Sequence, residues 1–159
     1  MSVITDIRDE LYTLIATKKA NTEFTYGNSF TLERTWRPYQ LLEKLSTDHP
    51  TGKVYIIGGT PIGYANQSRT NMVLGEYSVM VGFQRYITDI DSLSEVDGYC
   101  AFVQELEDAC RTEVDADQYA FTRLEFLRDP DGEPFSFILM REAQTFEAYF
   151  TVYYNRIRF

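Results

Sequence analysis

The chain contains one histidine, His49, and this residue limits the chemistry that its side chains can perform. A Ser-His-Asp or Cys-His arrangement would have to use His49 as its base, and a metal site built from a pair of histidines is excluded. His49 stands next to Pro50 in a turn-forming stretch, where a solvated histidine is the simpler interpretation. The sequence therefore favours an ordinary turn residue over a catalytic one.

The segment Asp129–Glu133, with the sequence DPDGE, is similar to the start of a calcium-binding loop. That loop requires a glutamate at its twelfth position, where this chain has Met140, and a helix on each side. Aspartate, proline and glycine at the first, second and fourth positions of a type I turn account for the same residues. We therefore expect a hairpin turn here and no bound metal ion.

The glycine-rich segment Gly58–Gly63 follows an apolar run, which makes it a candidate phosphate-binding loop. Such a loop needs a Gly-Lys-Ser/Thr sequence and a following amphipathic helix, and the sequence supplies neither. The carboxylates of Asp89 and Asp91, and those of Asp115 and Asp117, flank expected helix ends, where acidic residues serve capping and solubility. The sequence thus predicts no catalytic, cofactor-binding or metal-binding residues, and a chain that is not an enzyme.

Composition and charge narrow the class of protein further. The 159 residues suit one domain, which we place over the whole chain, residues 1–159. A formal net charge of −9 opposes tight binding of nucleic acid, which needs clustered lysine and arginine. Cys100 and Cys110 fall roughly 15 Å apart on one expected helix, too far for a disulfide, so reduced thiols and a cytoplasmic environment are predicted. The sequence contains no run of about 18 apolar residues, so no membrane-spanning helix is predicted.

Two amphipathic helices are expected from apolar residues at three- and four-residue spacing. The first runs from about Val3 to Lys19, with Ser2 as its cap. Ser92 and Glu95 have the spacing of a capping box at the start of the second, which continues to about Arg111. The predicted apolar stripe of this second helix consists of Leu93, Val96, Cys100, Val103, Leu106 and Cys110.

Alternating or apolar runs predict the strands, and a further short helix is expected at 41–45. The expected strands are residues 30–36, 54–57, 74–87, 119–127, 135–140 and 146–154. Between them, residues 58–72 are rich in Gly, Pro, Asn, Gln, Ser and Thr, which favours a protruding irregular loop. This order of elements predicts an α+β fold with a mixed, largely antiparallel sheet and the two main helices packed on one face.

Residues 149–159 combine aromatic side chains with Arg156 and Arg158, a composition that could serve base stacking or protein contact. The surrounding negative charge disfavours nucleic acid. We therefore interpret this segment as a sheet strand whose exposed aromatic side chains meet another subunit.

The element order and several local patterns resemble the tail-terminator and neck proteins of tailed bacteriophages. The resemblance covers nearly the whole chain, and no single motif in it is specific. It depends on the helix at 3–19, residues 30–38 leading into 54–57, Arg69 before the strand at 77–83, Asp91 before the second helix, and the closing strand at 146–154.

What the resemblance implies is a homo-oligomeric ring, expected to be a hexamer, that caps the tail tube and joins it to the head-side connector or stopper protein. The sheath protein is a further partner if the tail is contractile. DNA would pass through an acidic lumen without specific binding, and the protein would belong to the virion after assembly in the host cytoplasm. The predicted interface residues are Tyr64, Asn66, Arg69, Tyr149, Tyr153, Arg156 and Arg158.

Two alternatives stay open at this point. The first is another neck or head-tail connector subunit, which binding to filled heads instead of tail tubes would distinguish. The second, ranked lower because no nucleophile and base are paired, is a small-molecule-binding domain or enzyme that uses the loop at 58–71. In that case Arg69 would contact an anion.

Overall fold

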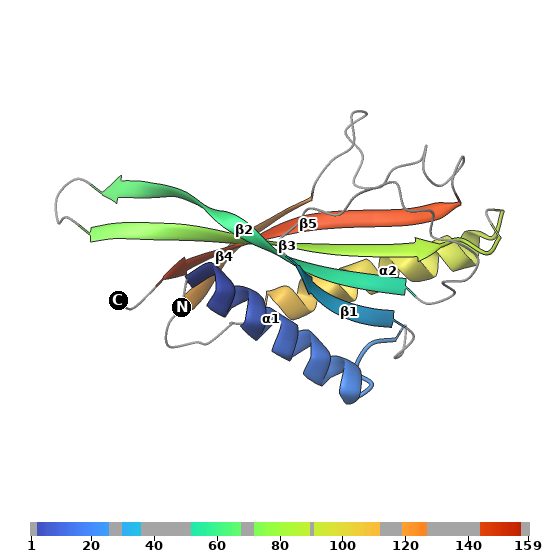
Figure 1. Ribbon diagram of the computed structural model, residues 1–159. Coiled ribbons are helices and arrows are strands. Elements are labelled where there is room, and N and C mark those ends of the chain that lie inside the picture. The colour runs from blue at the N-terminus through green and yellow to red at the C-terminus, as the bar shows by residue number, and fades with distance from the viewer. Residues whose placement is uncertain are drawn as a thin grey trace.

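The computed structural model describes residues 3–25, 30–35, 52–67, 72–89, 91–111, 119–126 and 144–156, and these residues form two helices and five strands (Figure 1). The elements are α1 (Val3–Ala20), β1 (Phe30–Thr35), β2 (Gly52–Gln67), β3 (Met72–Tyr86), α2 (Leu93–Cys110), β4 (Tyr119–Phe126) and β5 (Thr145–Arg156). Several predictions lie outside the described residues: the turn residues 49–51 and 129–132, the helix at 41–45, the strand at 135–140 and the acidic pair at 115 and 117.

The strands form one mixed sheet in the order β1-β2-β3-β5-β4. β1 runs parallel to β2, and every other neighbouring pair is antiparallel. Buried side chains of α1 and α2 join those of alternate strand residues in one hydrophobic cluster, so both helices pack on the same face of the sheet. The predicted α+β class, with its largely antiparallel sheet and two helices on one face, is confirmed.

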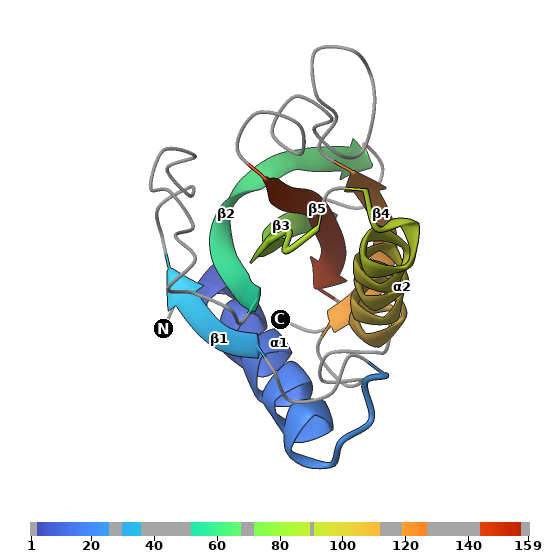
Figure 2. The ribbon, with the colours of Figure 1, turned by 90° about the vertical axis from the view of Figure 1, so that its right-hand side faces the viewer.

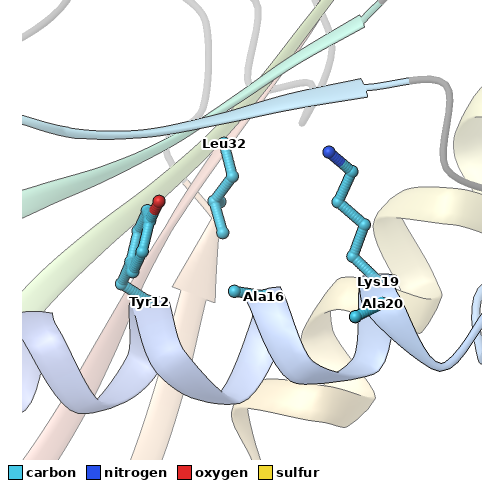
Figure 3. Close-up of a pocket in the computed structure, with 5 residues that line it drawn as sticks. All are labelled: Tyr12, Ala16, Lys19, Ala20 and Leu32. Carbon is cyan, nitrogen blue, oxygen red and sulfur yellow. The ribbon is translucent and has the colours of Figure 1, made fainter.

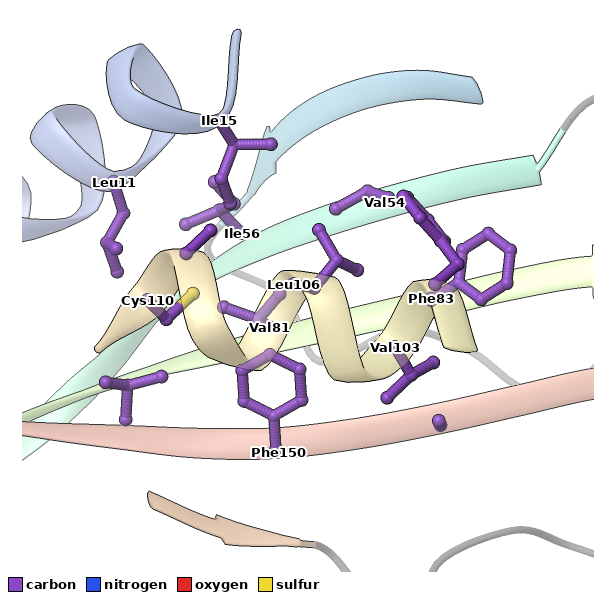
Figure 4. Close-up of a cluster of buried hydrophobic side chains, with 14 of the residues drawn as sticks. Leu11, Ile15, Val54, Ile56, Val81, Phe83, Val103, Leu106, Cys110 and Phe150 are labelled. Carbon is purple, nitrogen blue, oxygen red and sulfur yellow. The ribbon is translucent and has the colours of Figure 1, made fainter. Parts of the chain in front are cut away.

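The core between helices and sheet is dense in aromatic and branched side chains (Figure 4). α1 buries Ile7, Leu11 and Ile15 completely, at the four-residue spacing of one helix face. β3 directs Val81 and Phe83 to the same cluster. The predicted helix from 3 to 19 is therefore confirmed.

α1 ends in a left-handed turn. Thr22 adopts a positive φ of 56°, and its N–H donates to the carbonyl oxygen of Lys19 at 3.1 Å. The N–H of Glu23 donates to the carbonyl oxygen of Lys18 at 3.0 Å, so two of the last helix carbonyls gain partners. Lys18 and Lys19 occupy the last turn, where positive charge suits the helix dipole.

α2 begins as predicted, but only half of the expected capping box forms. The N–H of Glu95 donates to Ser92 Oγ at 3.4 Å. The Glu95 carboxylate accepts from the backbone N–H of Thr88 at 2.7 Å and of Asp89 at 3.0 Å, while the N–H of Ser92 donates to the carbonyl oxygen of Asp89. The carboxylate therefore fixes the turn before the helix and does not bond to its own cap residue.

The buried face of α2 differs from the predicted stripe. Leu93, expected to be buried, is 74% exposed, and Val96 and Cys100 are only partly buried. Tyr99 and Phe102, absent from the prediction, are buried instead because their rings meet Phe83 of β3. The residues that α2 buries are Tyr99, Phe102, Val103, Leu106, Glu107, Ala109 and Cys110.

The two cysteines are free thiols, as predicted. Cys110 is fully buried, and desolvation, followed by the charge of Glu107, raises its pKa to about 12. Its carbonyl oxygen accepts a hydrogen bond from the buried hydroxyl of Tyr154 at 3.0 Å. This bond ties the end of α2 to β5.

The prediction of an irregular loop at 58–72 is wrong for residues 58–67 and 72, which belong to strands, and residues 68–71 lie outside the described residues. β2 continues to Gln67 and pairs with β3 as far as Gln67 opposite Met72. The register shifts between Gly58 and Pro61 and again between Ile62 and Tyr64, and such bulges break the two-residue alternation on which a strand prediction depends. β1 pairs with β2 only as far as Ile57, so at Pro61 the described neighbour of β2 is β3 alone. The missing N–H of Pro61 therefore removes no hydrogen bond to β1.

Candidate assembly surfaces

The outer part of the β2–β3 hairpin projects from the body of the sheet. β5 pairs with β3 only from Tyr86 back to Glu76, and β1 pairs with β2 only up to Ile57. Residues 64–67 of β2 and 72–75 of β3 therefore have only each other as described strand neighbours, and they extend past β5 and the helices in Figure 1. We call these residues the arm. A two-stranded ribbon is marginal in water and leaves backbone groups on both edges available for a partner strand.

Two of the predicted interface residues lie on the arm. Tyr64 is paired with Gly75 and Asn66 with Val73. Arg156 is the last residue of β5, and its neighbour Asn155 pairs with Glu76 at the base of the arm. Arg69 and Arg158 lie outside the described residues. The structure thus brings Tyr64 and Asn66 together on the arm.

Tyr149 and Tyr153, predicted to be exposed on the closing strand, are instead buried. Each is only 8% exposed, because β5 is an interior strand between β3 and β4. Tyr153 donates its hydroxyl to Glu125 Oε2 at 3.1 Å, and the guanidinium of Arg123 lies 4.1 Å from its ring centroid. The expectation of exposed aromatic side chains on this strand is therefore wrong for these two tyrosines.

The face of the sheet opposite the helices is buried as well, and we call it the second face. Tyr55, Ile57 and Tyr149 form a separate buried cluster there, with Met80 packed against it. Alternation along β2, β3 and β5 places these residues opposite the main core. A strand that is buried on both faces has a nearly continuous apolar sequence. In β5 the sequence shows this pattern through Tyr149, Phe150, Tyr153 and Tyr154.

A polar pair lies beside this cluster on the second face. Glu147 and Gln84 are direct cross-strand partners, 7% and 2% exposed. Desolvation raises the pKa of the Glu147 carboxyl, and hydrogen bonds from Tyr149 and Gln84 only partly offset this effect. The ionised form of Glu147 is therefore less favourable in the folded chain than in the unfolded chain.

Glu147→Gln is expected to stabilise the protein at neutral pH. Because the folded pKa lies above the unfolded value of about 4.3, the folded state binds more protons, and stability falls as pH rises from about 4 through the folded pKa. The amide keeps an acceptor for its neighbours and removes this loss. Urea unfolding at pH 7 and near pH 4 measures the difference between variant and wild type, which should shrink at the lower pH.

The exposed carboxylate of Glu33 on β1 supplies the matched control. Glu33→Gln should give no comparable gain at pH 7, because an exposed side chain loses little hydration on folding. A Glu147→Gln variant no more stable than the wild type at pH 7 would contradict the effect of burial.

A groove of about 420 Å³ lies between α1 and the edge strand β1 (Figure 3). Tyr12, Ala16, Lys19 and Ala20 of α1 line one wall and Leu32 of β1 the other. Lys19 extends its Nζ from the helix toward the strand, 5.2 Å from the ring centroid of Phe30. The described lining combines small apolar side chains with the ring of Tyr12 and the cation of Lys19, and these five residues include no nucleophile next to a base.

Arg34 marks the other end of this groove. Its guanidinium lies 4.6 Å from the ring centroid of Tyr12 and forms an ion pair with Asp9 at 3.3 Å. Lys19, in contrast, forms no ion pair with any carboxylate in the part of the chain that the structure describes. At the end where α1 stops, the groove therefore has a positive charge that lies near the Phe30 ring and pairs with no described carboxylate.

The acidic residues before α2 act locally. Asp91 donates its N–H to Asp89 Oδ1 at 3.0 Å, as expected for residues that shape the turn before a helix. Over the described residues, no group of three or more His, Cys, Asp or Glu side chains is arranged to hold a metal ion. None of the described helices has the length and apolar character needed to cross a lipid bilayer.

A chain of hydrogen bonds that the sequence did not reveal fixes the first turns of α2. Arg85 of β3 donates through Nε to the hydroxyl of Tyr99 at 2.9 Å, and this hydroxyl donates to Glu95 Oε1 at 2.6 Å. Desolvation raises the pKa of Tyr99 well above its usual range, and the bond to Glu95 adds to this effect. The tyrosine therefore stays protonated and holds the helix against the sheet.

No protein-family model matches the sequence, and no curated protein is similar to it. The resemblance to tail terminators consequently stays a prediction, and a function has to be inferred from the arm, the groove and the second face.

Proposed function

We propose that this chain is a tail terminator of a tailed bacteriophage, a structural subunit whose ring, expected to be hexameric, caps the tail tube and joins it to the head-side connector. The arm is the observation that carries the proposal. Its two strands continue beyond the point where β5 and β1 stop, and no other described strand pairs with the backbone groups on their outer edges, which suit a strand of another protein. A chain that works through assembly needs such a projecting surface.

The arm is suited to contact the last ring of tube protein. Strand addition supplies directional backbone hydrogen bonds, and side chains on the arm select the partner. Tyr64 and Asn66 are the arm residues that we assign to this selection, because their types are common in protein interfaces and adaptable contacts. The body of the protein, with its two helices on one face, would form the ring.

The charge of the chain is compatible with the passage of DNA. Each subunit has a formal net charge of −9, so a ring of copies presents an acidic surface to the phosphate backbone. Repulsion between like charges keeps DNA from binding to the lumen. In this proposal the protein is part of the tail in the virion, and DNA moves through it without a specific site.

The arm can be removed without touching the core. We replace residues 63–75 by an Asn-Gly turn, which closes a tight hairpin where Ile62 faces Glu76. The shortened chain should keep the far-ultraviolet circular dichroism and unfolding transition of the body and lose binding to tail tubes of the phage that encodes it. Negative-stain imaging of tubes incubated with each form measures the fraction of capped ends.

Three outcomes decide between the candidates. Wild-type protein at the ends of tubes, and no binding by the shortened chain, supports the proposal. Binding to filled heads in preference to tubes identifies a different neck or connector subunit. A wild-type protein that stays monomeric and binds neither structure overturns the assembly function.

The small-molecule alternative has lost its structural basis in part. It placed a ligand in a loop at 58–71, and residues 58–67 instead belong to β2. Arg69, its anion contact, lies outside the described residues. No observation on the described residues favours this alternative over assembly.

A further inference from the structure

Leu93 is an exposed hydrophobic side chain held in a fixed position. It lies in the first turn of α2 with 74% of its surface exposed, the one large hydrophobic residue so exposed among those described. The turn does not fray freely, because Ser92 caps the helix and Glu95 accepts two backbone N–H groups from the preceding residues. The chain therefore presents a pre-ordered apolar knob on its surface.

Gly98 lies on the solvent-exposed side of the same helix, about 140° around its axis from Leu93 and so beside the face that Leu93 and Asp97 share. A glycine inside a helix is less favourable than alanine, so a packing reason is normally required. The position where a Cβ would stand at Gly98 has no atom within 4 Å, and nothing described within the subunit needs the glycine. Its exposed neighbours Asp97 and Ala101 are also short. This face of α2 allows close approach by another chain.

The groove between α1 and β1 has the complementary properties. Ala16, Ala20 and Leu32 give it an apolar part beside the ring of Tyr12, and Lys19 supplies a positive charge without an acidic partner among the described residues. On α2, Asp97 follows Leu93 by four residues and so lies one turn along the same face. An apolar side chain and a carboxylate at this spacing match an apolar groove with a lysine at its end.

The two surfaces lie on different flanks of the subunit. In Figure 2, α2 is on one side of the molecule, and α1 with β1 is on the other. One copy can therefore use its α2 face and its groove at the same time. Such a pair of different surfaces produces head-to-tail assembly, which closes into a ring when the rotation per subunit permits.

We propose that α2 of one copy docks in the α1–β1 groove of the next copy, with Leu93 inserted beside Leu32 and Asp97 paired with Lys19. Closure into a ring rests on the proposed function, whereas head-to-tail association follows from the two surfaces alone. The partner is a second copy because one chain carries both the α2 face with Leu93 and Asp97 and the groove with Leu32 and Lys19.

Sedimentation velocity on the full chain over a range of concentrations tests this contact. Leu93→Asp should weaken association at least thirtyfold, the loss typical of a buried interface anchor. Lys19→Glu and Asp97→Lys should each weaken association about tenfold, and the double variant should recover most of the wild-type affinity. Glu33→Lys changes the net charge by the same amount and sign as Asp97→Lys. Because Glu33 lies on β1 outside the groove lining, this variant should associate near the wild-type level.

Gly98→Ala separates folding from docking. The new methyl group meets open space within the subunit and improves helix propensity, so Tm should rise by about 2–4 °C. Because Gly98 stands about 140° around the helix axis from Leu93, its methyl group lies outside the contact of Leu93 and Asp97, and association should stay within about threefold of the wild-type level. A loss of association as large as that of Leu93→Asp would overturn docking through Leu93 and Asp97.

The remaining outcomes are equally decisive. A wild-type chain that stays monomeric at every concentration, or a Leu93→Asp variant that associates like the wild type, overturns the contact. Single charge variants that weaken association without recovery in the double variant overturn the pairing of Asp97 with Lys19. Rings that cap no tail tube leave the contact standing and contradict the tail-terminator function, whereas wild-type protein that caps tubes, together with a Leu93→Asp variant that associates like the wild type, leaves the function standing and overturns the contact.

Discussion

Phe102→Ala is expected to lower the free energy of unfolding by about 3–5 kcal/mol, a large share of the stability of a domain of this size. Phe102 is 1% exposed, and its ring centroid lies 4.8 Å from that of Phe83, 5.0 Å from Phe30 and 5.5 Å from Phe24. These three rings belong to β3, β1 and the segment after α1. Because each is held by a different element, they cannot all move to fill the space that the phenyl group leaves. Urea unfolding followed by circular dichroism measures the loss.

Leu93→Ala on the same helix is the matched control for this prediction. Leu93 is 74% exposed, so its truncation should change the free energy of unfolding by no more than about 0.5 kcal/mol. If Phe102→Ala leaves too little folded protein for measurement, Phe102→Leu retains most of the volume and should cost about 1–1.5 kcal/mol. A loss below about 1 kcal/mol for Phe102→Ala would show that the ring is not packed between these three neighbours.

The importance of Phe102 was not predictable from the helix pattern alone. Periodicity correctly predicts α2, and Val103, Leu106 and Cys110 belong to both the predicted and the observed buried face. The aliphatic stripe and a second stripe through Tyr99 and Phe102 overlap on these residues, so the sequence allows two rotations of the helix about its axis. The aromatic partners on β1 and β3 decide between them, and those contacts are distant in sequence.

The strands show a related limit. β1, β3, β4 and β5 follow from alternating residues, whereas the outer half of β2 does not. The propensities of Gly58, Gly59 and Pro61 favour a loop, but pairing with the regular strand β3 overrides them through two shifts of register. Local sequence signals cannot report a partner strand, and for this reason the arm, on which the proposed function depends, was missed.

The candidate surfaces were predicted only in part for the same reason. The composition of residues 58–72 places Tyr64 and Asn66 in a loop as contact residues. In the structure both lie on the arm because β2 pairs with β3 at these positions. The spacing of Leu93 from the other apolar residues of α2 predicts a core position. The side chain is exposed because the helix packs on the sheet through a different face. An exposed side chain at a core-like position is a signal that requires both the pattern and the structure.

Gly82→Ala is expected to cost about 2–3 kcal/mol of stability, although it adds a single methyl group. Gly82 of β3 pairs with Tyr149 of β5, whose ring crosses over it on the second face. A Cβ at Gly82 would stand 2.1 Å from Tyr149 Cε1 and 2.3 Å from Cδ1, closer than any side-chain contact permits. The ring would have to turn away from Tyr55 and Ile57, against which it is buried. Urea unfolding measures the cost.

The clash can be separated from the general effect of alanine in a strand by a double-mutant cycle with Tyr149→Ala. Once the ring is absent, Gly82→Ala should cost little, so the two substitutions should couple by at least about 1 kcal/mol. Gly98→Ala provides the opposite case, since its methyl group meets open space and should stabilise the helix by about 0.5–1 kcal/mol. Equal costs for Gly82→Ala with and without the Tyr149 ring would mean that the second face is not packed around this glycine. The opposite signs expected for two glycine-to-alanine changes follow from their surroundings: one glycine is required by the fold, and the other faces open space within the subunit.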